Sequence, residues 1–141
     1  FLRPLGLRLA FRKFMPTDYE GMENNYFAPN IPLMRYANVL LMKAEALNEL
    51  GQTTEAISLI NQVRERADMP DMKGTSQAQV REQIEHERLL EFPLENLRFY
   101  DLRRWGKTQE ALKAVGRDFN PDKNNFYPIP IQEINTNNAL H

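Results

Sequence analysis

The feature that most constrains this chain is a run of apolar residues spaced three and four apart from Leu33 to Leu50. This spacing is typical of an amphipathic helix with one buried side. The glycine that follows, Gly51, is placed to end the helix in a left-handed conformation. The residues predicted to face the core are Leu33, Tyr36, Ala37, Leu40, Ala44, Leu47 and Leu50.

A second helix is predicted to start at Thr53 or Thr54, either of which has a side chain suited to an N-cap, and to stop before Pro70. Its predicted buried face comprises Ala56, Ile57, Ile60, Val63 and Ala67. Because only a few residues separate the two helices, they are expected to fold back on each other as an antiparallel hairpin over residues 33–67.

This hairpin resembles a tetratricopeptide unit. Small residues stand where two helices must approach closely, and the turn between them is tight. The positions that match the motif are Ala44, Leu47, Gly51, Ala56 and Ile60. A single unit cannot cover its own apolar faces, so the following helices are the expected neighbours.

Those following helices are predicted at about residues 76–92 and 95–105. Ser76 and Gln79 have the spacing of a capping box, and Val80, Ile84 and then Leu89 or Leu90 are predicted to be buried. The next helix ends at Gly106, and a short helix follows between Thr108 and Gly116. The predicted class is therefore all-α, built from tetratricopeptide-like hairpins.

The two ends of the chain lack helical periodicity. Residues 1–32 contain four prolines and read as an irregular arm, with "LRLAFRKF" as a strand or extended piece. So long an irregular opening is unusual for a compact domain and indicates that sequence upstream of Phe1 is missing. Residues 117–141 are predicted to be extended and tied to the surface by Phe126, Tyr127, Ile129 and Ile131. The predicted domain is residues 33–141.

Composition narrows the classes of function. A chain of 141 residues with 42% hydrophobic and 26% charged residues fits one globular domain. Its formal net charge of -1 argues against a nucleic-acid or anionic-membrane surface, since both need a concentrated positive field. With no cysteine, disulfides and thiolate chemistry are excluded. No apolar stretch approaches the roughly 20 residues of a membrane span, and no signal peptide is recognisable.

The densest chemistry lies in "ERLLEFPLENLRFYDLRRWG", residues 87–106. Its acids have arginines at helical neighbour spacing: Arg88 with Glu91, and Arg98 and Arg104 with Asp101. Such pairing keeps carboxylates ionised, which suits structural ion pairs better than general acid/base catalysis. The sequence therefore predicts a structural ion-pair seam, with no catalytic residue, formed by Arg88, Glu91, Arg98, Asp101 and Arg104.

Metal and cofactor sites are not predicted. A zinc helix containing His86 and Glu87 would need a second histidine at position 90, which is Leu90. We expect His86 at the surface or the edge of the core. There is no phosphate-binding glycine loop and no dinucleotide fingerprint.

Ligand contacts cannot be assigned from the sequence alone. Aromatic side chains stack on sugar rings when exposed, and the candidates here are Tyr19, Tyr26 and Phe27. A core or loop-anchoring role is the alternative for each of them.

Four motifs together carry a family resemblance: "IPLMRYANVLLMKAEALNELG", "LINQVRERA", "IEHERLLEF" followed by "RFYDLRRWG", and "FYPIPIQEI". In this order, over roughly residues 30–140, they resemble the C-terminal part of the SusD/RagB family. Where that family usually has an acid followed by glycine before the arginine, this chain has Glu95 and Asn96. Asn tolerates the left-handed conformation that such a turn requires.

The resemblance implies a lipoprotein of the outer-membrane cell surface of Bacteroidetes, used in polysaccharide utilisation and nutrient uptake. It would bind a glycan or another nutrient without catalysis and act with a SusC-like TonB-dependent transporter. Family members are several times longer, so their N-terminal lipid and sugar contacts have no counterpart here. Two alternatives remain: a tetratricopeptide-like scaffold for protein interactions, and a glycoside hydrolase using Glu87, Glu91 or Glu95.

Overall fold

The computed structural model describes Lys13, residues 32–137 and Ala139. Within these residues all regular secondary structure is helical, as predicted. None of these described helices is both long enough and apolar enough to cross a membrane. The contacts group the chain into two units, residues 1–94 and residues 95–141. The helices are α1 (Tyr36–Glu49), α2 (Thr53–Arg66), α3 (Gln77–Glu91), α4 (Arg98–Arg104), α5 (Thr108–Ala114), α6 (Pro121–Asn124) and α7 (Ile131–Thr136).

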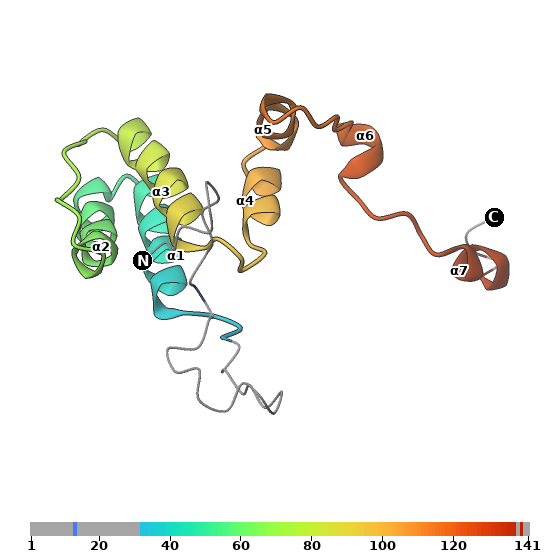
Figure 1. The fold of residues 1–141 in the computed structure, drawn as a ribbon, viewed down its shortest axis with the longest axis horizontal. Helices are drawn as coiled ribbons and strands as arrows, with labels where there is room; N and C mark the ends of the chain where they lie inside the picture. The colour runs from blue at the N-terminus through green and yellow to red at the C-terminus, as the bar shows by residue number, and fades with distance from the viewer. Residues whose placement is uncertain (1–12, 14–31, 138, 140–141) are drawn as a thin grey trace, which may run out of the picture. The chain divides into compact units, whose positions relative to one another are not determined.

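The first unit is built around the predicted hairpin. Helices α1 and α2 pack against each other, and α3 packs against both (Figure 1). Ala44 and Ala56, the small residues of the tetratricopeptide-like pattern, are completely buried. The larger core side chains are Leu40, Leu41, Ile60, Val63, Val80, Ile84 and Phe92. Each contributes about 1.5–3 kcal/mol through removal from water.

The turn between α1 and α2 forms as the sequence predicts. Gly51 has φ +81°, its N–H donates to the Asn48 carbonyl at 3.0 Å, and the Gln52 N–H donates to the Leu47 carbonyl at 2.9 Å. This is the Schellman arrangement, which satisfies carbonyls at the helix end. The predicted threonine cap is wrong, because Gln52 is the N-cap of α2 and Thr53 is already its first helical residue.

The start of α1 also differs from the prediction. The helix begins at Tyr36, and Leu33 before it is 99% exposed. Tyr36 and Leu50 are exposed as well, whereas Asn38 and Asn48 are buried. The buried side of α1 therefore includes the two asparagines. The Asn48 amide donates a hydrogen bond to α3, and the Asn38 amide accepts one from α3.

Helix α3 starts with the predicted capping box. The Gln79 N–H donates to Ser76 Oγ, and the Ser76 N–H donates to the Gln79 side chain at 3.1 Å. Its last turn contradicts the prediction, because Leu89 and Leu90 are 45% and 58% exposed. Glu87 and Arg88 are buried in their place, since they follow Ile84 by three and four residues on the same side of the helix.

The second unit begins with a turn in which Asn96 has φ +58°, the conformation that asparagine tolerates. Helix α4 starts at Arg98, later than predicted, and packs against α5. Gly106 and Gly116 have φ +70° and +72° and end α4 and α5 at the predicted places.

The segment after Gly116 is not extended throughout. Helix α6 forms where the Asn120 side chain accepts from the Asp122 N–H and Pro121 occupies the first turn. Helix α7 follows Pro130. Tyr127, Ile129 and Ile131 are exposed, which contradicts the prediction that they tie the chain to the surface. Phe126, the fourth residue of that prediction, is exposed too, but its ring centroid lies 4.7 Å from the guanidinium carbon of Arg103 in α4. The irregular arm predicted over residues 1–32 lies outside the described residues, apart from Lys13 and Pro32.

Candidate functional site

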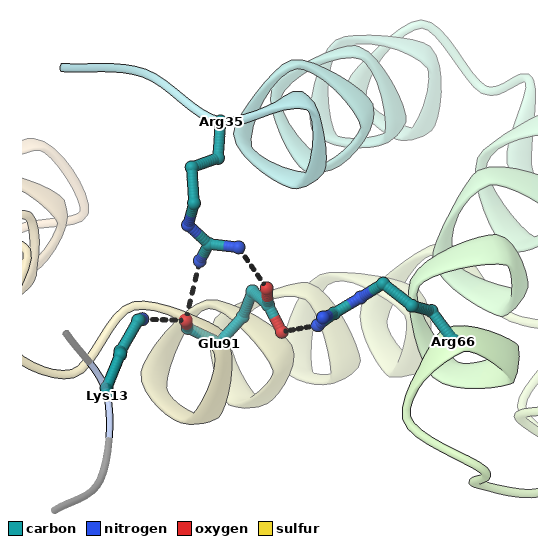
Figure 2. Close-up of polar contacts among 4 residues, drawn as sticks. All are labelled: Lys13, Arg35, Arg66 and Glu91. Carbon is teal, nitrogen blue, oxygen red and sulfur yellow. Dashed lines mark hydrogen bonds and ion pairs between the residues drawn. The ribbon is translucent and has the colours of Figure 1, made fainter. Parts of the chain in front are cut away.

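Glu91, at the end of α3, makes polar contacts with three cationic side chains. Its Oε1 accepts from Arg35 Nη1 at 2.6 Å, and its Oε2 accepts from Arg66 Nη2 at 2.6 Å (Figure 2). Its main-chain oxygen accepts from Lys13 Nζ at 2.7 Å and from Arg35 Nη2 at 2.9 Å. Three cations therefore meet the C-terminal end of α3, where the helix dipole also favours positive charge.

One turn earlier on α3, Glu87 is held in a similar way. Its Oε1 accepts from Arg64 Nη1 of α2 and, at 2.6 Å, from Gln83 Nε2. Arg64 also donates through Nε to the Pro70 carbonyl at 2.7 Å. The same arginine thus joins α2, α3 and the segment that connects them.

The predicted partner of Glu91, Arg88, makes other contacts. Its Nη1 donates to Asn38 Oδ1 of α1 at 2.9 Å in a buried position. The guanidinium carbons of Arg88 and Arg35 lie 5.1 and 5.2 Å from the centroid of the Phe92 ring. Phe92 is therefore contacted by two cations, which attract its ring electrostatically.

The start of α3 is fixed to the end of α1 by a reciprocal pair of hydrogen bonds. Asn48 Nδ2 donates to the Gln77 carbonyl at 3.0 Å, and Gln77 Nε2 donates to the Asn48 carbonyl at 2.6 Å. Nearby, Arg81 binds both carboxylate oxygens of Glu49 at 2.8 Å. The hydrogen bond from Arg81 holds the pKa of Glu49 below its ordinary value of 4.5, and the same bond raises the pKa of Arg81.

In the second unit, Asp101 is buried and accepts from Arg104 Nε at 3.0 Å. Arg98, the other predicted partner, lies with its guanidinium carbon 5.9 Å from the Trp105 ring centroid. Its Nη1 is buried and has no hydrogen-bond partner among the described residues. Arg104 contacts the same ring at 4.6 Å. Of the two arginines predicted to pair with Asp101, the structure brings Arg104 to it.

The residues of the predicted seam are described within each unit in turn. Glu91 joins α3 to α1 and α2, whereas Asp101 pairs within α4. The predicted pairs from Arg88 to Glu91 and from Arg98 to Asp101 are wrong. In both, the arginine precedes the acid, and helical side chains lean toward the N-terminus, which carries the arginine away from it.

This arrangement is suited to holding helices together. The Glu87 and Glu91 oxygens that accept hydrogen bonds are bound by arginines that come from other parts of the first unit. Among the described residues no three His, Cys, Asp or Glu side chains group as metal ligands, and His86 is exposed. The aromatic candidates Tyr19, Tyr26 and Phe27 lie outside the described residues.

Sequence reasoning missed Arg35, Arg64, Arg66 and Asn38 as partners in these clusters. A signal for one of them was present, because Arg64 follows the buried Ile60 by four residues and so shares its side of α2. Arg35 immediately precedes α1 and carries no periodicity of its own, so its pairing depends on the tertiary fold.

Comparisons with known proteins all find SusD-like proteins. The SusD family matches residues 9–141. Three SusD-like proteins of Formosa agariphila are similar: P38 is 45% identical over 61% of this chain, P25 is 34% identical over 96%, and P2 is 37% identical over 86%. The chain spans only 19%, 28% and 27% of their respective lengths.

A solved structure agrees with these relatives. A SusD-like protein from Bacteroides fragilis is 40% identical with a TM-score of 0.54, and the match covers 55% of this chain and 15% of that one. The family match extends over nearly the whole chain, from residue 9 to residue 141. The chain belongs to the SusD family.

Proposed function

We propose that this chain is part of a non-enzymatic surface protein that binds a glycan or another nutrient. The observation that carries the proposal is the family match over residues 9–141, supported by relatives that are 34% to 45% identical. By the same family relationship, the protein would be a lipoprotein of the outer membrane and would deliver its ligand to a SusC-like TonB-dependent transporter.

The clusters around α3 support the non-enzymatic part of the proposal. Glu87, Glu91 and Glu95 were the candidate carboxylates of a glycoside hydrolase. Of these, Glu87 and Glu91 are bound by arginines from α2. A hydrolase needs two carboxyl groups that face the sugar from either side of the bond to be cleaved. Carboxylates held by arginines between packed helices do not face a sugar.

The test uses the full-length protein of which this chain is part. Immobilised polysaccharides and peptides are screened for retention of the protein, and the same mixtures are assayed for products. We expect retention by at least one nutrient polymer with no product. Retention by none of them, or product formation that a Glu87→Gln change abolishes, would refute the proposal.

The transporter is tested separately. A tag on the full-length protein is used to purify it from outer membranes in mild detergent. A TonB-dependent transporter is expected in the eluate at a stoichiometric level. Its absence, with the tagged protein intact and in the same membrane fraction, would contradict the partnership while leaving ligand binding untouched.

A further inference from the structure

We draw no further inference here: the strongest candidate, the exposed apolar surface of α1 formed by Tyr36, Val39 and Met42, carries none because nothing in the part of the chain that the structure describes shows what covers it.

Discussion

Replacing Glu91 with glutamine tests whether its cluster stabilises the first unit. Glutamine keeps the shape of the side chain and one acceptor oxygen but removes the charge that Arg35 and Arg66 bind. The contacts of Arg35 and Lys13 with the main-chain oxygen of residue 91 remain. The substitution therefore isolates the two ion pairs.

The expected magnitude follows from exposure. The Glu91 side chain is 11% exposed, Arg35 is 23% exposed and Arg66 is 61% exposed. An exposed pair such as that with Arg66 contributes up to about 1 kcal/mol. A half-buried hydrogen bond to a charged group contributes about 1.5–3 kcal/mol, of which glutamine retains a part. We expect Glu91→Gln to lower the free energy of unfolding by about 1–3 kcal/mol.

The assay must report on the first unit alone. Trp105, the one tryptophan of the sequence, belongs to the second unit, so its fluorescence is unsuitable for this purpose. Hydrogen exchange of the amides of α1, α2 and α3 measures their opening free energy directly. The control is Glu82→Gln, an exposed acid of α3, which should change that free energy by less than about 0.5 kcal/mol.

The reasoning is refuted if Glu91→Gln lowers the opening free energy of these amides by no more than Glu82→Gln does. A double-mutant cycle with Arg66→Met then assigns the energy to the pair. For that exposed pair the coupling free energy should be about 0.2–1 kcal/mol. A coupling of zero together with a large single effect would place the stabilisation in Arg35 instead.

Four further outcomes are expected. Asp101→Asn should destabilise the second unit by about 1–3 kcal/mol in urea unfolding followed by tryptophan fluorescence, because Asp101 is buried and bound to an arginine. Gly51→Ala should cost about 1–2 kcal/mol in hydrogen exchange of α1, because position 51 has φ +81° with open space around it. Ser76→Ala should cost about 1 kcal/mol in exchange at the start of α3. Glu49, whose pKa is lowered, should add a small stability present above its unfolded pKa and lost as pH falls through its folded pKa, so Glu49→Gln should flatten that part of the pH profile.

Each of these has a contrary outcome. Asp118→Asn, at an exposed site, is the control for Asp101, and equal midpoints would remove the role of the buried pair. Gly51→Asn should cost less than Gly51→Ala, and a larger cost would contradict the left-handed explanation. Unchanged exchange after Ser76→Ala would show that the capping box is dispensable. If the loss of stability at acidic pH is the same in Glu49→Gln as in the parent chain, that loss comes from other titrating groups and the prediction is wrong.

The helices and several of their ends were predictable because their signals are local. Gly51, Gly106 and Gly116 each end a helix with positive φ, and Ser76 caps α3. The local backbone dictates these features, so one sequence is enough to find them.

The prediction of buried residues in the last turn of α3 was wrong because it selected the leucines for their hydrophobicity, although their positions do not fit the helical period. The pattern that starts with Val80 and Ile84 continues through Glu87 and Arg88, whereas Leu89 lies on another side of the helix. Had the 3.6-residue period been followed, the charged residues would have been placed inside with partners. Those partners come from α1 and α2, and their identity depends on packing that one sequence does not specify.

The arginines of α2 connect the stability of the hairpin to the packing of α3. Arg64 and Arg66 are two residues apart, about 200° around the helix, so they reach α3 from opposite flanks of α2, with Glu65 between them. Arg64 binds Glu87, and Arg66 binds Glu91 one turn further along α3. Because a carboxylate near the core is costly without its partner, both pairs must form together, and they fix the rotation of α2 against α3.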